Sequence, residues 1–240
     1  METSITTPAG GSAAGAGLLG RDVSALVPAA ADVPGLIDMS PAERSVWDRA
    51  VGHLHVRDND VHTVYAFGIA KALVAAVDGA RPEIVLPAIL LHDTGWSRVP
   101  EDRVLEAIAP QPRHPELVRV HEIEGAAIAR AVLEDLGRDP ADIDAIVAIV
   151  DGHDTRAEAM NPSDAVVKDA DKLWRLTPHG LATVQRWFGL TPDAALRIVS
   201  GRTHDHLHTA PARTMARALA AIASIDLSPQ RRALARQGEW

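Results

Sequence analysis

The sequence contains no cysteine, so disulfide bonds and thiolate metal sites are excluded, and any metal must be bound by imidazole and carboxylate groups. Positive charge is also in short supply, because the formal net charge is −8. This argues against general binding to nucleic acid, which requires clustered Lys and Arg. Long apolar runs are missing, and the N-terminus lacks the basic start and apolar segment of a secretory signal. These absences predict a soluble, cytoplasmic protein that binds neither membranes nor nucleic acid.

A chain of 240 residues with 47% apolar content can bury one sizeable core. Residues 1–38 are rich in Ala, Gly, Ser, Thr and Pro, with a low-complexity centre at Gly10–Gly17. Such a segment buries too little apolar surface to offset the entropy of ordering it. Leu26-Val27 and Leu36-Ile37 are apolar pairs in its later half that are suited to docking on the domain. We expect a mobile tail over residues 1–38 and a single helical domain over residues 39–240.

Helical spacing of the apolar residues predicts an all-α protein. Ser40-Pro41-Ala42-Glu43 forms a capping box, with a Ser cap, Pro at the first helical position and Glu three residues after the cap. Asn59 or Asp60 is expected to cap a second helix, and Ser163 or Asp164 a later one. Helices are predicted at about residues 41–51, 59–77, 82–94, 101–108, 115–136, 140–150, from 164 onward, 192–199, 211–225 and 229–236.

The stretch Ile89-Leu90-Leu91-His92-Asp93-Thr94-Gly95-Trp96 places an imidazole and a carboxylate side by side at the end of an apolar run. Two adjacent polar groups are costly to bury there unless something binds them, and a divalent metal offsets that cost more completely than a hydrogen bond does. The alternative is an ordinary helix that ends in polar residues and a Gly stop. The pair by itself leaves both interpretations open.

Further histidine and aspartate residues extend this pattern along the chain. His62, His121, His153 and Asp171 each lie on the apolar stripe of a different predicted helix, or at the end of that stripe. A lone histidine in such a position is more often structural than functional. Asp169 competes with Asp171 as a ligand, but it faces another side of the same helix.

The order of these residues, H, HD, H, H and D over 110 residues, resembles the HD-domain superfamily of metal-dependent phosphohydrolases from about Asp58 to Leu176. The resemblance implies an HD-type helical bundle, and the family's Ala-Asp-Lys/Arg-Leu pattern favours Asp171. The implied metal ligands are His62, His92, Asp93, His121, His153 and Asp171.

Six ligands exceed what one metal needs, so we expect two divalent cations, roughly 3.5–4 Å apart, with Asp93 as the bridge. Without His121 and His153, the remaining four ligands would form a mononuclear site. Iron or manganese is favoured, and zinc, cobalt, nickel or magnesium is also compatible with such ligands.

The resemblance implies hydrolysis of a small phosphorylated substrate, such as a nucleotide, phosphomonoester or phosphodiester, through a metal-activated water. Asp93 is then catalytic, and Asp154, directly after His153, is expected to orient an imidazole or relay a proton. Lys172, Arg156 and Arg98 lie next to motif positions and are candidates for binding phosphate oxygens, although each equally suits an exposed surface.

Other interpretations share this ligand order. The mixed-valence di-iron oxygenases of the superfamily, such as myo-inositol oxygenase and the enzymes that cleave carbon–phosphorus bonds, use iron to activate oxygen; myo-inositol oxygenase has Lys where this chain has Trp96. A ligand-sensing HD domain without catalysis is disfavoured because no ligand position is lost. Gly125 either makes room for metals or permits close helix packing. We interpret His53, His55 and the cluster His204-Asp205-His206-Leu207-His208 as surface or packing residues.

Overall fold

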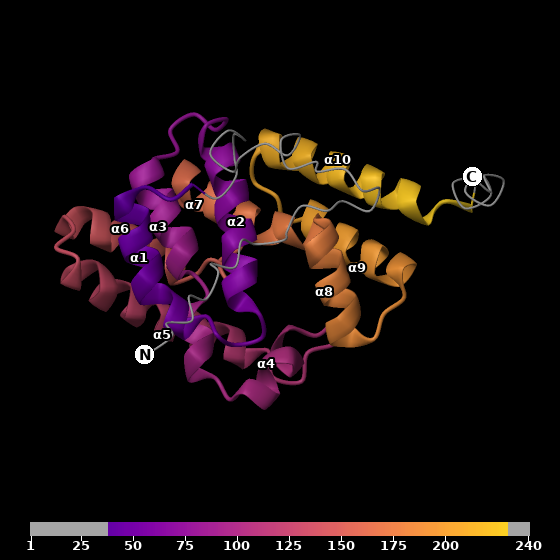
Figure 1. Ribbon diagram of the computed structural model, residues 1–240, viewed down its shortest axis with the longest axis horizontal. Helices are drawn as coiled ribbons and strands as arrows, with labels where there is room; N and C mark the ends of the chain where they lie inside the picture. Colours follow the sequence, from indigo (N-terminus) through magenta and orange to yellow (C-terminus); the bar gives the residue numbers. More distant parts are fainter. Residues whose placement is uncertain (1–37, 230–240) are drawn as a thin grey trace, which may run out of the picture. The chain divides into compact units, whose positions relative to one another are not determined.

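The structure, a computed structural model, describes residues 38–229, and from Met39 onward these belong to one compact unit (Figure 1). The described residues contain ten α-helices and no β-strand, which confirms the all-α prediction. The predicted tail lies outside them apart from Asp38, and so remains a prediction. None of the described helices is long and apolar enough to cross a membrane.

The helices are α1 (Pro41–Ala50), α2 (Asn59–Val74), α3 (Pro82–Leu91), α4 (Glu101–Ile108), α5 (Glu116–Asp135), α6 (Pro140–Val150), α7 (Pro162–Leu173), α8 (Pro178–Phe188), α9 (Pro192–His204) and α10 (Ala210–Leu227), with short 3₁₀ turns η3 (Val51–His53), η4 (Thr94–Arg98) and η5 (Trp174–Leu176).

Helix α3 forms the centre of the bundle because it is apolar on all sides. Every residue from Ile84 to Leu91 is buried, and α3 contacts α1, α2, α5, α6 and α7. A helix without a polar face must be enclosed by other helices. His92 and Asp93, which directly follow α3, therefore emerge inside the bundle, where both are buried.

Helices α8, α9 and α10 pack beside this central group and appear in orange and yellow in Figure 1. Helix α8 contacts α9, α9 contacts α10, and α10 contacts α7. The sequence did not single out α8, and α9 continues five residues beyond the predicted end at Val199. Gly201 weakens helix propensity there, but the burial of Val199 and Thr203 extends the helix. The helix expected at 229–236 lies outside the described residues except for Pro229.

The capping box at the start of α1 is present as predicted: the Glu43 amide donates to Ser40 Oγ, and the Ser40 amide donates to Glu43 Oε2. The predicted cap of α7 was wrong. Pro162 occupies the first turn, so the cap is the residue before it, Asn161, instead of Ser163 or Asp164. The Asn161 side chain accepts a hydrogen bond from the Asp164 amide at 3.0 Å.

The start of α2 also differs from the prediction. Its cap is Asp58, which has a left-handed backbone and makes no capping hydrogen bond through its side chain. Asn59 is instead the first helical residue, and its side-chain oxygen accepts a hydrogen bond from Arg57 at 3.0 Å. The helix ends at Val74 rather than near residue 77.

A second, smaller apolar cluster lies around η4 and α4. Trp96, Val99, Val104 and Ala107 are buried together in it. Helix α4 has the bounds that the sequence predicted, and its burial against α5 keeps the segment that follows Asp93 close to the ends of the central helices.

Candidate metal centre

Six polar side chains converge inside the bundle, each at most 5% exposed. They come from the first turn of α2, the residue pair after α3, the second turn of α5, the turn after α6 and the last turn of α7. Burial of so many polar groups in one place is costly unless they bind something. The six residues are His62, His92, Asp93, His121, His153 and Asp171, the same set that the sequence suggested.

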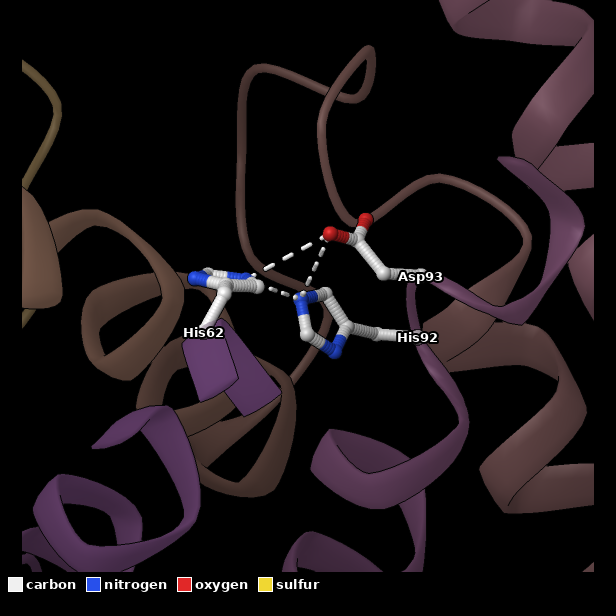
Figure 2. A group of neighbouring side chains, drawn as sticks. All are labelled: His62, His92 and Asp93. Atoms are coloured by element: carbon white, nitrogen blue, oxygen red, sulfur yellow. Dashed lines mark hydrogen bonds and ion pairs between the residues drawn. The ribbon is translucent and has the colours of Figure 1, made fainter. Parts of the chain in front are cut away.

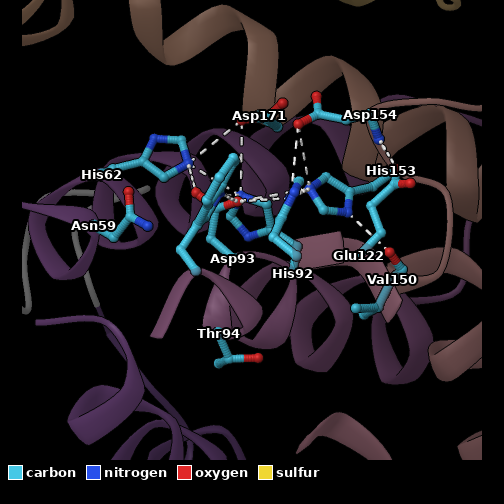
Figure 3. Close-up of polar contacts among 12 residues, drawn as sticks. Asn59, His62, His92, Asp93, Thr94, Glu122, Val150, His153, Asp154 and Asp171 are labelled. Atoms are coloured by element: carbon cyan, nitrogen blue, oxygen red, sulfur yellow. Dashed lines mark hydrogen bonds and ion pairs between the residues drawn. The ribbon is translucent and has the colours of Figure 1, made fainter. Parts of the chain in front are cut away.

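Asp93 lies between two pairs of histidines. Figure 2 shows it with the pair His62 and His92, and Figure 3 adds His153 of the other pair. Its Oδ2 atom is 3.4 Å from His62 Nε2 and 3.7 Å from His92 Nε2. Its Oδ1 atom is 3.7 Å from His121 Nε2 and 3.6 Å from His153 Nε2. Each pair of histidines with Asp93 brings three donor atoms within 4.8 Å of one another, so two groups able to bind a cation share one carboxylate.

Each histidine pair has a further carboxylate of its own. Asp171 Oδ1 is 3.4 Å from His62 Nε2 and 3.7 Å from His92 Nε2. Asp154 Oδ2 is 3.8 Å from the Nε2 atoms of both His121 and His153. In the view of Figure 3, Asp171 and Asp154 both lie above Asp93. The second group therefore has a carboxylate at Asp154, for which the sequence suggested orienting an imidazole or relaying a proton.

The backbone orients two of the imidazole rings. His92 Nδ1 lies 2.8 Å from the Ile89 carbonyl oxygen, and His153 Nδ1 lies 2.9 Å from the Val150 carbonyl oxygen. A carbonyl accepts only, so in each neutral ring the proton is on Nδ1 and the lone pair on Nε2. Both lone pairs then point at the cluster, where the two Nε2–Nε2 separations are 3.0 Å (His62 and His92) and 3.3 Å (His121 and His153). Such a donor set fits a divalent cation in each group.

Trp96 contacts both the shared carboxylate and one histidine. Its Nε1–H donates a hydrogen bond of 3.1 Å to Asp93 Oδ1. Its ring stacks on His121, with ring centroids 4.0 Å apart and planes 9° from parallel. Trp96 thus fixes the orientation of Asp93 and of His121 at the position where some relatives of this motif carry Lys.

The residues of the cluster differ in the direction in which their surroundings shift the pKa. Burial opposes ionisation of Asp93, but the surrounding histidines hold its pKa well below the usual value. Burial also opposes a charge on His153, yet the hydrogen bond with Asp93 and the charge of Asp154 raise its pKa to about 9. Burial and the nearby His153 lower the pKa of His121 to about 4. Asp93 is therefore a carboxylate at neutral pH, which suits it to bind cations.

Buried polar groups secure the loop between α6 and α7 that carries His153 and Asp154. Glu122 on α5 accepts hydrogen bonds from the amides of Asp154 and Thr155, each at 2.8 Å. Lys168 on α7 donates to the carbonyl oxygens of Gly152, His153 and Arg156 at 2.7–2.9 Å. Both ends of the loop are thus tied to neighbouring helices, and these hydrogen bonds hold the backbone of His153 in place.

Two glycines let the segment after α3 touch α5. A Cβ atom on Gly95 would overlap with the backbone of His121 and Gly125, and one on Gly125 would meet the backbone of Gly95 and His92 at 3.3 Å. Of the two interpretations of Gly125, close packing is therefore the one that the contacts support. This approach brings His121 next to Asp93.

Asp169, the competing candidate on α7, faces away from the cluster. Its two oxygens accept the amide hydrogens of His208 and Thr209 at 2.7 and 2.9 Å, so it fixes the start of α10. His204, at the end of α9, has its Nδ1 2.9 Å from the Ser200 carbonyl oxygen. His53 lies 3.4 Å from Ser97 Oγ. These histidines do not belong to either of the cation-binding groups found among the described residues.

A cavity of about 350 Å³ opens from the cluster. Its charged lining includes the carboxylates Asp93, Asp154 and Asp171, and its apolar lining comes mainly from residues 107–118 and from α8 and α9. The lining residues are Arg57, His62, Asp93, Trp96, Ala107, Ile108, Ala109, Pro110, Pro112, Pro115, Val118, Asp154, Asp171, Lys172, Trp174, Arg175, Val184, Trp187, Phe188, Ile198, Val199, Arg202 and Thr203.

Of the three suggested phosphate-binding residues, Lys172 lines the cavity, whereas Arg98 and Arg156 are not among its lining residues. Arg98 is exposed on η4. Arg156 donates to Asp164 Oδ2 at 3.3 Å and to the Ala148 carbonyl oxygen at 3.1 Å, and so supports the loop after α6.

Sequence reasoning missed three arginines that line the cavity: Arg57, Arg175 and Arg202. Arg175 has a readable signal, since it lies four residues after Asp171, and the two side chains are 3.7 Å apart. Arg202 donates to the carbonyl oxygens of Ile108, Ala109 and Pro110, a contact between distant segments that no local pattern indicates.

Arg57 is held between two tryptophan rings, its guanidinium 5.2 Å from the centroid of Trp96 and 4.8 Å from that of Trp187. Both Arg57 (φ 57°) and Asp58 (φ 61°) have left-handed backbones, which is costly for residues other than glycine. Asp58 also pairs with Arg186 on α8 at 2.7 Å. This unusual backbone directs the charge of Arg57 over the cavity.

Comparison with protein families matches residues 59–176 to the HD domain. Comparisons with curated proteins and with solved structures gave no significant match. The matched segment begins with α2, ends with η5, and contains all six residues of the polar cluster. A domain of this kind, with two His/Asp groups that share a carboxylate, is typical of metal-dependent hydrolases. Residues 59–176 of this chain therefore match the HD-domain family, and the His/Asp cluster that they bring together fits the metal site of such a domain.

Proposed function

We propose that this protein is a metal-dependent phosphohydrolase that cleaves a small phosphorylated substrate, with His62, His92, Asp93, His121, His153 and Asp171 as the ligands of two divalent cations. The observation that carries the proposal is the shared carboxylate: the two oxygens of Asp93 each face a different pair of histidine Nε2 atoms at 3.4–3.7 Å. Bound cations supply Lewis acidity, which promotes ionisation of water and stabilises negative charge on phosphate oxygens. Iron or manganese remains the favoured metal.

Cations of the chain itself support a phosphorylated substrate. Arg57 and Lys172 line the cavity, and among the described residues neither forms an ion pair with a carboxylate. Arg175 also lines the cavity, and its charge is only partly offset by Asp171 at 3.7 Å. Positive groups that face a cavity and are not engaged in direct ion pairs attract anions, and a guanidinium matches the geometry of phosphate oxygens. We assign Arg57, Arg175 and Lys172 to phosphate binding in this proposal.

Asp154 is the carboxylate that we assign to proton transfer. It lines the cavity, its side chain is 25% exposed, and its Oδ2 is 3.8 Å from two histidine Nε2 atoms. Glu122 and Lys168 fix the loop on which it lies. A carboxylate that is held at the cluster and reaches the cavity can accept a proton during attack or return it to the leaving oxygen.

The test is phosphate release by the purified protein in Mn²⁺ or Fe²⁺, measured with a panel of nucleotides, phosphomonoesters and phosphodiesters. We expect release that Asp93→Asn lowers by at least about 100-fold, because the variant loses the charge shared by both histidine pairs. Asp142→Asn, a change of the same kind on the surface of α6, should leave the rate unchanged.

The same samples distinguish the oxygenase. Oxygen uptake with a polyol or phosphonate, together with a mixed-valence electron paramagnetic resonance signal and no phosphate release from any ester, would overturn the hydrolase. Phosphate release without oxygen uptake would support it.

A further inference from the structure

The cavity beside the metal cluster concentrates the aromatic residues of the protein. The chain has only five Trp, one Tyr and two Phe residues. Four of these eight residues line this cavity: Trp96, Trp174, Trp187 and Phe188. Trp174 contacts the His62 ring edge-on at 4.5 Å, and Trp187 lies beside Trp174 with ring centroids 6.0 Å apart. The aromatic surface therefore begins at the metal cluster and continues away from it.

Aliphatic residues extend this surface. Val184 on α8 and Ile198 and Val199 on α9 line the cavity, as do Ile108 and Val118 from the segment between α4 and α5. Apolar lining of this extent stabilises a bound apolar group by removing its surface from water.

Away from its charged residues, the same lining has little capacity to bind hydroxyl groups. Thr203 is the only lining residue with an uncharged hydroxyl or amide side chain. Pro110, Pro112 and Pro115 have no backbone N–H to donate. The carbonyl oxygens of Ile108, Ala109 and Pro110 already accept hydrogen bonds from Arg202 at 2.9–3.5 Å. A polyol enclosed there would leave hydroxyl groups without partners, which lowers affinity.

From this distribution we infer that the protein selects phosphate esters whose alcohol part is aromatic or an extended apolar group, and rejects esters of sugars and other polyols. The inference rests on the proposed hydrolase function. The phosphate would meet Arg57, Arg175 and the metal cluster, and the apolar part would lie along the tryptophans and α9. The cavity volume of about 350 Å³ suits a molecule of this size.

The first test compares benzyl phosphate with glycerol 1-phosphate and glucose 6-phosphate, all esters of primary alcohols. We expect kcat/KM for benzyl phosphate to exceed that for each polyol ester by at least about tenfold, the discrimination that apolar pockets commonly achieve. Equal values, or a preference for either polyol ester, would overturn the inference and leave the hydrolase proposal intact.

The second test places a polar group on the apolar wall. Ile198 lines the cavity, is only partly buried, and stands outside the main hydrophobic core, so Ile198→Asn should fold. It should lower kcat/KM for benzyl phosphate at least about fivefold, mainly through KM, and change the value for glycerol 1-phosphate less than about twofold. Ile222→Asn on α10, where the isoleucine is 59% exposed, is the matched control and should affect neither ester. An equal loss for both esters in Ile198→Asn would contradict the apolar wall.

A binding measurement separates this inference from the hydrolase function. Titration calorimetry of the metal-loaded protein should show benzylphosphonate binding at least about tenfold more tightly than 2-hydroxyethylphosphonate. If this preference appears while no ester is hydrolysed, the selectivity stands and the hydrolase proposal fails. If the two phosphonates bind equally, or neither binds, the inference is wrong whatever the protein hydrolyses.

Discussion

At the scale of single residues, the site depends on which of several similar side chains faces inward. Asp169 and Asp171 differ by two positions on α7, yet one holds the amides at the start of α10 and the other lies 3.4 Å from His62. The helical rotation of about 100° per residue separates their roles. The two aspartates therefore offer a test in which the same chemical change has different consequences.

Asp171→Asn is expected to lower the metal content of the purified protein, because metal ligands of this kind contribute strongly to affinity. Its phosphatase rate should fall at least about tenfold. Asp169→Asn should keep the metal but lose about 1–3 kcal/mol of unfolding free energy, since an amide cannot accept both backbone hydrogens as a carboxylate does. Elemental analysis and urea denaturation of the two variants check this. Loss of metal in Asp169→Asn with retention in Asp171→Asn would reverse the assignment.

Glu122 is a buried carboxylate whose contribution to stability depends on pH. Burial raises its pKa, but hydrogen bonds from Thr155 outweigh this and bring the value to about 2 from the usual 4.5. The folded pKa is depressed, so the stabilisation is present above the usual value and is lost as the pH falls from about 4.5 towards 2.

Glu122→Gln should therefore lower the unfolding free energy by about 1–3 kcal/mol at pH 7, and by progressively less below pH 4.5. Urea denaturation of both proteins with chelator present, at pH 7 and pH 3, measures the difference. A difference that does not change with pH would show that the ionised carboxylate is not what stabilises the loop after α6.

At the scale of elements, the cluster requires that η4 and α5 approach backbone to backbone. The residue pair after α3 and the imidazole on α5 meet because Gly95 and Gly125 carry no side chain. Gly95 lies in a 3₁₀ turn, so helix propensity does not explain why glycine is needed there. The reason is steric, because a Cβ atom on this residue would overlap with the backbone of α5.

Gly95→Ala is expected to destabilise the protein by about 1–3 kcal/mol or more, because the added Cβ atom overlaps with the backbone of His121 and Gly125. It should also lower the metal content, since His121 must move. Gly201→Ala is the control: that glycine lies inside α9 with no atom within 4 Å of an added Cβ, so alanine should stabilise by about 0.5–1 kcal/mol. Thermal unfolding and elemental analysis give both results. Equal stability of Gly95→Ala and the wild type would contradict the close approach.

At the scale of the whole molecule, residues 59–176, which match the HD domain, contain the proposed ligands, while α8 and α9 supply much of the cavity wall. Helix α7 ends in η5, and η5 contacts both α8 and α9, so the two parts of the cavity are joined through Trp174 and Arg175. The ligands come from helices spread over more than 100 residues, so a bound cation joins segments that would separate on unfolding.

Two cations per chain are expected, and their removal should destabilise the fold. Free metal at about 100 times its dissociation constant adds about 2.7 kcal/mol per site, so chelation should lower the melting temperature by several degrees. Elemental analysis should give two metals for the wild type and one for His121→Ala and for His153→Ala. One metal in the wild type and in both variants would show that the site is mononuclear.

The sequence by itself predicted most of the helices, though not α8, and it named the residues that form the cluster. The apolar periodicity of α3, the capping box of α1 and the prolines at helix starts are local signals, and each produced an element close to its expected bounds. The six residues proposed as ligands could be named because each lies at a readable position on an apolar stripe, and because their order resembles a known family. Such features can be predicted from the sequence because the interactions that produce them join residues close together in the chain.

Only the tertiary structure decided which charges meet the cavity. Arg57 reaches it through a left-handed backbone and two tryptophans 39 and 130 residues away, and Arg202 through carbonyl oxygens more than 90 residues away. Arg156 appeared suited to phosphate, but Asp164 and backbone carbonyls bind it instead. Long side chains have many rotamers, and their partners are set by which helices pack together. The position of the charged group of such a side chain is therefore set by the packing of the helices, and it cannot be predicted from a local stretch of sequence.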